Sequence, residues 1–222
     1  MVMMAIPCAC CDGTLDSGAR PGYDTFMLES VPATDPLYLH VRVLLGMVVG
    51  LGLTHLLRNF ARLIDRPLQS KVYWVHALWA VFVFVYLLHF WWWEFHLAGK
   101  IQWTFLLYLF VTLYALLLYL LCTVILPEDM SAHDRYREYY FARRQWIFGL
   151  LALVFAVDLC DTWIKGQDYF NSFGLEYPLR NAIYMACSLV AMRVRSGWYH
   201  GSFVLLAFVY QISWIIRQFE TL

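Results

Sequence analysis

Six stretches of the chain are apolar over a length that suits a membrane-crossing helix, and polar residues gather between them. A hydrocarbon core of ~30 Å requires about 20 residues of helix. The stretches cover residues 37–64, 72–93, 101–126, 146–163, 178–192 and 197–216. None of them alternates polar and apolar residues with a period of two, which disfavours a β-barrel. The pattern therefore predicts an all-α, polytopic helical bundle with six transmembrane helices in residues 37–222.

The basic residues favour one side of the predicted bundle. The loops after the first, third and fifth helices hold ten of the 16 lysine and arginine residues, namely Arg58, Arg62, Arg66, Lys71, Arg135, Arg137, Arg143, Arg144, Arg193 and Arg195. Loops rich in lysine and arginine remain on the cytoplasmic side. Both termini are therefore predicted to lie outside (N-out/C-out). No organelle signal is present, so we expect a multi-pass protein of the bacterial inner membrane.

The composition agrees with a membrane protein. The chain of 222 residues is 62% hydrophobic and 14% charged, whereas a typical soluble domain has about 25% charged residues. The formal net charge of zero gives no basic stripe for a nucleic acid. The six cysteines do not form a disulfide framework. Three of them lie singly in apolar segments, where a cysteine usually packs as a small hydrophobe: Cys122, Cys160 and Cys187.

Residues 1–36 differ from the rest of the chain. This segment is acidic and rich in Gly, Pro and Ser, and it lacks the basic start and the apolar stretch of a signal peptide. We expect a flexible acidic outer tail. Its run PCACC, with Cys8, Cys10 and Cys11, has no second CxxC and is a weak indication of metal binding.

A basic, tyrosine-rich segment precedes the fourth predicted helix. It runs SAHDRYREYYFARRQ over residues 131–145. Ser131 and Asp134 fit a helix-capping pattern, and the composition suits an interfacial helix on anionic lipid. The alternative is a plain basic loop on the cytoplasmic side.

The first predicted helix carries small residues and polar residues on adjacent faces. Gly46, Gly50 and Thr54 recur every four residues and predict a close helix contact, through which the protein would form a homo-oligomer or bind another membrane subunit. His55 and Asn59 lie on a neighbouring face, which continues to Arg62. Polar groups inside a membrane usually face the protein interior and mark a pathway or site. The alternative is that the arginines extend to the cytoplasmic surface.

Two carboxylates lie near the outer end of the fourth predicted helix. Asp158 and Asp161 are three residues apart and share a face, and Arg180 opens the fifth helix at a similar depth. A structural ion pair is one interpretation. The other is a cation or proton uptake site, because neighbouring groups tune buried carboxylates. With His55 and Asn59, these three residues are candidates for a polar lining.

Four histidines raise the possibility of bound haem. In antiparallel helices, His40 and His89 would lie near the outer surface, and His55 and His76 nearer the inner one. This arrangement would suit a di-haem b-type electron carrier. However, His76 and His89 are 13 residues apart and differ by a net rotation of about 220°, so they do not share a helix face. The alternative is that these histidines form hydrogen bonds between helices.

A divalent metal is a further possibility at the outer end. His89, Glu94, His96 and Asp158 have the ligand types that suit zinc. Neither HxxxH nor HExxH is present, and His89 and His96 share a face only if the helix continues through Glu94.

The run HFWWWEFH, residues 89–96, attracts attention because it holds three adjacent tryptophans. Adjacent positions on a helix point about 100° apart, so Trp91, Trp92 and Trp93 do not line one pocket, and at least one faces outward. Tryptophans are enriched at membrane surfaces, which predicts an aromatic belt. His89 and Trp93 are four residues apart, and their side of the helix is the one expected to face the protein.

The stretches GLGLTHLLRNFARLI and VYWVHALWAVFVFVYLLHFWWW cover the first two predicted helices. They resemble a group of small, uncharacterised integral membrane proteins of proteobacteria. The resemblance implies a polytopic membrane protein and assigns no activity and no functional residue.

Three functions follow as hypotheses. The first is a channel, a transport-related protein or an auxiliary membrane subunit, the second is a di-haem electron carrier, and the third is a structural or assembly protein without a ligand. The sequence lacks GxSxG, a P-loop and a CxxC beside a redox helix, which favours a non-enzymatic role. The lipid bilayer is the expected environment, and haem b or a divalent metal are the candidate cofactors.

Overall fold

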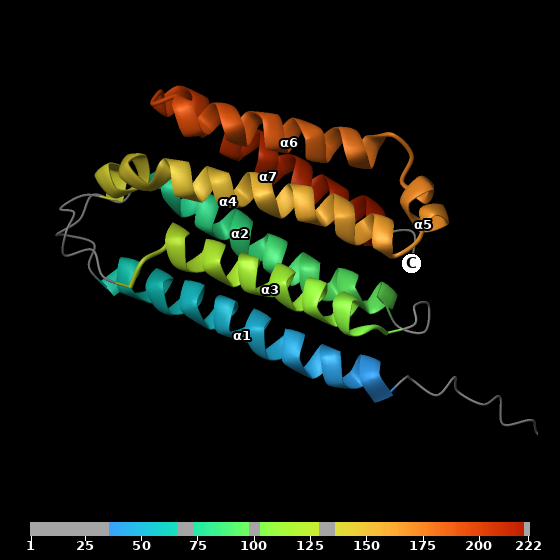
Figure 1. The fold of residues 1–222 in the computed structure, drawn as a ribbon. Coiled ribbons are helices and arrows are strands. Elements are labelled where there is room, and N and C mark those ends of the chain that lie inside the picture. Colours follow the sequence, from blue (N-terminus) through green and yellow to red (C-terminus); the bar gives the residue numbers. More distant parts are fainter. Residues whose placement is uncertain (1–35, 66–72, 98–102, 129–135, 220–222) are drawn as a thin grey trace, which may run out of the picture. The chain divides into compact units, whose positions relative to one another are not determined.

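The computed structural model describes residues 36–65, 73–97, 103–128 and 136–219 (Figure 1). These residues form only helices and their connections. The elements are α1 (Pro36–Asp65), α2 (Trp74–Trp93), the 3₁₀ turn η1 (Glu94–Leu97), α3 (Phe105–Ile125), α4 (Tyr136–Ile164), α5 (Gln167–Ser172), α6 (Glu176–Arg193) and α7 (Gly197–Phe219). The predicted all-α bundle is therefore confirmed, while the tail of residues 1–35, with its three cysteines, lies outside the described residues.

The long helices form two layers. In one layer α1 packs on α3, α3 on α4, and α4 on α6; in the other, α2 packs on α7 and also contacts α1, α3 and α4. Successive long helices run antiparallel (Figure 1). As a result, the last residues of α2, α4 and α7 and the first residues of α1, α3 and α6 lie at the same end of the bundle as α5. We call this the α5 end.

Five helices are long and apolar enough to cross a membrane, at Leu37–Leu63, Trp74–Trp93, Phe105–Ile125, Tyr136–Ile164 and Gly197–Arg217. Their outward faces carry large apolar side chains, such as Leu113 on α3 and Leu206 on α7. Burial in lipid removes such surface from water. The length and composition of these five helices are those of a multi-pass membrane protein. The sixth predicted span corresponds to α6, whose 18 residues include Glu176, Arg180 and Arg193.

An aromatic core joins the two layers at mid-bundle. Trp79 of α2 is fully buried and meets the rings of Phe82, Phe148 and Phe203 edge-on at centroid distances of 5.0–5.3 Å. Each such pair contributes about 0.5–1.5 kcal/mol beyond the burial of its area. This packing fills the space between the polar groups at the two ends of the bundle.

The segment before the fourth span is part of the span helix. α4 is continuous from Tyr136, and both Tyr139 and Tyr140 are buried. The Tyr139 hydroxyl donates to the carbonyl of Val124 at 2.7 Å, and the Tyr140 hydroxyl is 2.9 Å from His200 Nδ1. Residues 136–145 therefore continue the span helix and do not form a plain loop, and two buried tyrosines attach them to the bundle. The capping residues Ser131 and Asp134 lie outside the described residues.

The loop between the fourth and fifth spans contains a short helix that the hydrophobic pattern did not predict. Gly166 has a φ of 127°, a conformation that side-chain-bearing residues rarely adopt. This residue turns the chain sharply after Lys165, and α5 follows at once.

Candidate functional site

A buried ion-pair triad lies at the α5 end. Asp161 is in the last turn of α4 and Lys165 follows it by four residues, so both project from the same side. The Lys165 ammonium donates to Asp161 Oδ2 at 2.5 Å and to Glu94 Oε1 at 2.9 Å. All three side chains are at most 5% exposed. The triad thereby ties η1, after α2, to the end of α4.

Burial sets the protonation of this triad. Removal of Glu94 from water and the nearby Asp161 carboxylate raise the pKa of Glu94 to about 8, although Lys165 opposes them. For Lys165, burial lowers the pKa, but Asp161 and Glu94 outweigh it and raise the pKa above its ordinary value. The lysine is therefore charged, and the pKa of Glu94 lies well above that of an ordinary glutamate.

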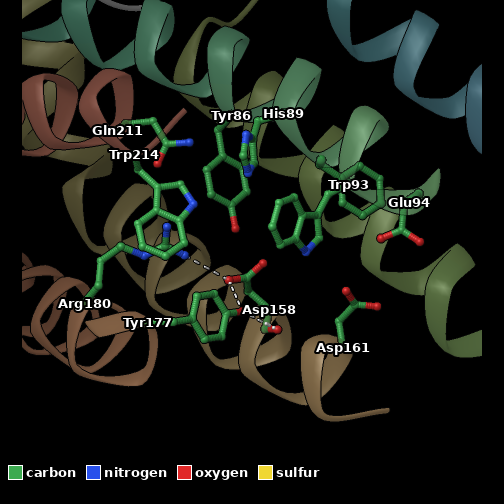
Figure 2. A pocket seen from close by; sticks show the side chains of 11 residues that line it. Tyr86, His89, Trp93, Glu94, Asp158, Asp161, Tyr177, Arg180, Gln211 and Trp214 are labelled. Carbon is green, nitrogen blue, oxygen red and sulfur yellow. Dashed lines mark hydrogen bonds and ion pairs between the residues drawn. The ribbon is translucent and has the colours of Figure 1, made fainter. Parts of the chain in front are cut away.

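A second network surrounds Asp158, one turn before Asp161 (Figure 2). Its Oδ2 accepts from the Tyr177 hydroxyl at 2.7 Å and from Asn181 Nδ2 at 2.8 Å. Arg180 Nη2 lies 3.5 Å from the same oxygen. Tyr114 of α3 donates to Oδ1 at 3.2 Å. The carboxylate is therefore held by side chains from α3 and α6.

The two carboxylates of the triad, Glu94 and Asp161, line one small cavity of about 20 Å³ together with Asp158, Tyr177 and Arg180 of the second network. A cavity needs about 10–15 Å³ to hold a water molecule, so this one admits one or two. The wall includes Trp93 and Trp214, which close it on two sides (Figure 2).

Several buried polar atoms in the cavity wall have no hydrogen-bond partner among the described residues. They are His89 Nδ1, Glu94 Oε2 and both the nitrogen and the oxygen of the Gln211 amide. Gln211 is 1% exposed, and leaving a buried polar group unsatisfied costs about 1–3 kcal/mol. The cavity is thus suited to a small polar molecule that both donates and accepts hydrogen bonds.

The charges around the cavity do not balance when every group is ionised. Three carboxylates, Glu94, Asp158 and Asp161, face two cations, Lys165 and Arg180. An uncompensated charge in the interior is costly. One bound proton neutralises the set, and the raised pKa of Glu94 favours a proton on this carboxyl.

The structure brings together only part of the predicted polar lining. Asp158, Asp161 and Arg180 meet at the α5 end. The anticipated ion pair of Arg180 is with Asp158, whereas Asp161 pairs with Lys165. His55 and Asn59 lie at the other end of α1, where both reach the carbonyl of Leu126 at 2.7 and 3.1 Å. The two groups therefore lie at opposite ends of the bundle.

The four histidines proposed for haem occupy different environments. His55 Nε2 and His76 Nε2 both bond to carbonyls at the end of α3, those of Leu126 and Ile125. The remaining two lie at the α5 end: His40 is exposed, and His89 lines the cavity. His55 and His76 thus form hydrogen bonds between helices, which was the alternative to haem binding. They pair with carbonyls that have no partner within α3 because they lie at its end.

Three of the proposed metal ligands, His89, Glu94 and Asp158, line the cavity but do not form a metal site. Among the described residues, no three His, Cys, Asp or Glu side chains lie close enough to hold a metal ion. Glu94 instead binds the Lys165 ammonium, which lies between the Glu94 and Asp161 carboxylates where a metal ion would otherwise bind. Asp158 is held by Tyr177, Asn181 and Arg180, and the His96 side chain lies outside the described residues. The α-helix ends at Trp93, so the continuation that would align His89 with His96 is not formed.

Two glycines of α1 pack closely against other helices of the chain. A Cβ atom on Gly46 would lie 3.0 Å from the Trp91 ring, and one on Gly52 would lie 2.9 Å from Leu87. Among the residues that the structure describes, nothing lies within 4 Å of the same position on Gly50, and Thr54 is exposed. Within the chain, the close contacts with α2 are made by Gly46 and Gly52. The predicted contact of the Gly46, Gly50 and Thr54 face with another subunit stays a prediction.

The three tryptophans of α2 point in three directions. Trp91 packs on Gly46, Trp92 is 44% exposed, and Trp93 stacks on His89 with ring centroids 5.3 Å apart. The expectation that one ring faces outward, and that the His89–Trp93 side faces the protein, is confirmed.

Sequence reasoning did not identify the central cation or the tyrosines. Lys165 lies in a predicted loop, although its spacing of four residues from Asp161 is typical of an ion pair along a helix. Tyr86, Tyr114 and Tyr177 carried no signal, because tyrosines are abundant in this chain and contacts between distant helices are not local.

Comparison with models of known families, with characterised proteins and with solved structures finds no match to this chain, so the geometry of the α5 end carries the functional interpretation.

Proposed function

We propose that this protein has a transport-related role in which the cavity at the α5 end binds a proton together with a small polar solute. The observation that carries the proposal is the Lys165 ammonium held between Glu94 and Asp161, with less than 6% of each side chain exposed. Ionisable groups inside a membrane protein are costly, and they commonly mark ion pathways and proton relays.

The excess carboxyl supports proton binding. Three carboxyls and two basic groups share the site, so its charge changes by one when Glu94 gains or loses a proton. A solute that both donates and accepts hydrogen bonds would contact the Gln211 amide and His89 Nδ1 in the same cavity. Binding of the solute and of the proton would then be coupled, because both alter the charge and hydrogen bonding of one small volume.

An alternating-access arrangement fits better than a permanently open channel. The aromatic core around Trp79 lies between the cavity and the polar groups of the opposite end. Passage of a polar solute would require these helices to move. We propose that α6 is the sixth span, because it packs along α4 and its charged residues lie at its two ends or in the Asp158 network.

The orientation is part of the proposal. The end of the bundle opposite to α5 carries Arg58, Arg62, Arg137, Arg143 and Arg193, and the positive-inside rule places such an end in the cytoplasm. The cavity would then lie near the outer surface, with N-out/C-out termini in a bacterial inner membrane. A role as an auxiliary subunit of a larger transporter is compatible with this site.

Reconstitution in liposomes tests the proposal. We expect the wild-type protein to conduct protons under an imposed membrane potential faster than empty liposomes, and Glu94→Gln to lose most of that flux. Glu138→Gln is the matched control, because Glu138 is an exposed carboxylate in the first turn of α4, at the end of the bundle opposite to the cavity. A wild-type rate equal to that of empty liposomes would contradict the proposal and favour a structural role. A Soret band in the purified protein would favour the electron carrier instead.

A further inference from the structure

A long apolar groove runs between α6 and α7. Its volume of about 690 Å³ falls in the range of about 300–1,000 Å³ of sites for small organic ligands. The middle of the groove is lined by apolar side chains from both helices, among them Leu179, Ile183, Phe203 and Leu206. Several of these side chains are more than half exposed in the isolated chain.

The groove exists because its two helices pack mainly on other partners. α6 lies against α4 and α7 lies against α2, in different layers of the bundle. Two tyrosines bridge the floor: the Tyr184 hydroxyl donates to Ala207 O at 3.0 Å, and the Tyr199 hydroxyl donates to Cys187 O at 2.8 Å. These bonds hold the two helices at a fixed spacing while the outer part of the groove stays open.

The groove ends in a charged pair at the α5 end. Arg217 of α7 contacts both carboxylate oxygens of Glu176, at 2.6 and 3.1 Å, and Tyr210 donates to the same carboxylate at 2.6 Å. The side chains of Glu176 and Arg217 are 45% and 48% exposed. One positive and one negative group are therefore accessible together, at the depth where these helices reach the membrane surface.

This distribution of charge and apolar surface matches one class of molecule. An apolar channel with a single polar end suits an amphiphile that lies parallel to the helices, as a bilayer lipid does. The Glu176–Arg217 pair has no net charge and offers a guanidinium for a phosphate, which arginine binds in bidentate fashion, and a carboxylate for an ammonium group. A headgroup that carries both charges complements it better than a purely anionic one.

We propose that the α6–α7 groove is a binding site for a zwitterionic phospholipid of the phosphatidylethanolamine type. One acyl chain lies along Ile183 and Leu206, the phosphate meets Arg217, and the ammonium meets Glu176. The proposal is independent of proton transport at the cavity. However, Arg180 lines both the groove and the cavity, so a bound lipid would lie beside the cation that pairs with Asp158.

Native mass spectrometry of the full chain tests the site. The protein would be reconstituted in vesicles of equimolar palmitoyl-oleoyl phosphatidylethanolamine and phosphatidylglycerol, extracted gently, and analysed for retained lipid. We expect phosphatidylethanolamine to be retained in preference by about fivefold, which corresponds to about 1 kcal/mol. Glu176→Gln should remove the preference, because the ammonium loses its partner while the phosphate keeps Arg217.

A second pair of variants tests the acyl-chain channel. Ile183→Trp with Leu206→Trp narrows the groove and should abolish most retention, whereas Leu113→Trp, an equally apolar and exposed position on α3, should leave it unchanged. All of these positions are exposed, so the fold should tolerate the substitutions.

Three results would overturn the proposal. They are equal retention of both lipids by the wild type, undiminished retention by the double tryptophan variant, and a dimer whose cross-links map to the groove, which would assign it to a second copy of the chain.

Discussion

Lys165 and Glu94 lie 71 positions apart in the sequence, yet the ammonium of one is 2.9 Å from a carboxylate oxygen of the other. The contact joins the turn after α2 to the turn after α4 and is almost completely buried. Asp161 completes the triad from the opposite side of the ammonium. The α5 end is therefore organised around one buried lysine with two carboxylates.

Removal of this lysine should destabilise the protein strongly. Lys165→Met leaves two carboxyls buried without their cation, and breaking a buried ion pair in this way costs about 3–5 kcal/mol. We expect a large fall in the melting temperature, measured by circular dichroism in detergent. Lys165→Met combined with Asp161→Asn should recover part of the loss. Arg217→Met is the surface control and should have a much smaller effect; equal losses in the two single variants would contradict the special role of the triad.

The two close-packed glycines of α1 should respond differently from Gly50. A methyl group on Gly52 would meet Leu87 at 2.9 Å, and overpacking of this kind costs about 1–3 kcal/mol. Gly50→Ala has free space and should stabilise the helix by about 0.5–1 kcal/mol. Thermal unfolding of Gly52→Ala and Gly50→Ala in parallel checks the contrast. If Gly50→Ala is the more damaging change, a partner helix covers Gly50, as the GxxxG pattern originally suggested.

His76 should matter for stability and not for light absorption. Its Nε2 bonds to the carbonyl of Ile125 at the end of α3, and the ring is 1% exposed. His76→Leu leaves that carbonyl unpaired, at a cost of about 1–3 kcal/mol. We expect a lower melting temperature together with an unchanged spectrum between the wild type and the variant. A Soret band that disappears in His76→Leu would show instead that the ring ligates haem.

Substitution of Asp158 should destabilise the protein more than substitution of a residue that donates a single hydrogen bond to it. Asp158→Asn leaves Arg180 buried without its counter-charge, whereas Tyr114→Phe removes only one of several hydrogen bonds, worth about 1 kcal/mol. We expect Asp158→Asn to lower the denaturation midpoint by several times as much as Tyr114→Phe does. Similar effects of the two substitutions would mean that Arg180 finds another partner, for example the rings of Tyr177 and Trp214 that it already faces.

The hydrophobic pattern predicted most of the architecture, because each long apolar stretch had to become a helix in a membrane. It gave the bounds of α2 and α7 closely and identified Asp158, Asp161 and Arg180 as one cluster. The pattern did not predict features that depend on contacts between residues far apart in the sequence. The pairing of Glu94 with Lys165 depends on how two loops meet, which the pattern within each helix does not encode. The Gly46–Gly50 spacing predicted a contact with another subunit, which stays a prediction; the close contact of Gly52 with α2 was not predicted.

The raised pKa of Glu94 also predicts how stability changes with pH. Its value of about 8 in the folded protein lies above the ordinary 4.5, so protonated Glu94 is favoured by folding. This contribution is fully present below about pH 4.5 and is lost as the pH rises through about 8. The pKa of Lys165 is raised above an ordinary value of 10.5, so Lys165 stays charged throughout this window. We expect the melting temperature to fall across it, and Glu94→Gln to flatten the fall; a melting temperature that rises from neutral to alkaline pH would contradict this.

The most direct test of the proton at the α5 end is pH-difference infrared spectroscopy of the purified protein. A protonated carboxylic acid has a carbonyl band that disappears on ionisation. We predict one such band with a midpoint of about pH 8, present in the wild type and in Glu176→Gln and absent in Glu94→Gln. A midpoint near the ordinary 4.5 of a glutamic acid, or a band that survives in Glu94→Gln, would contradict the assignment of the bound proton to Glu94.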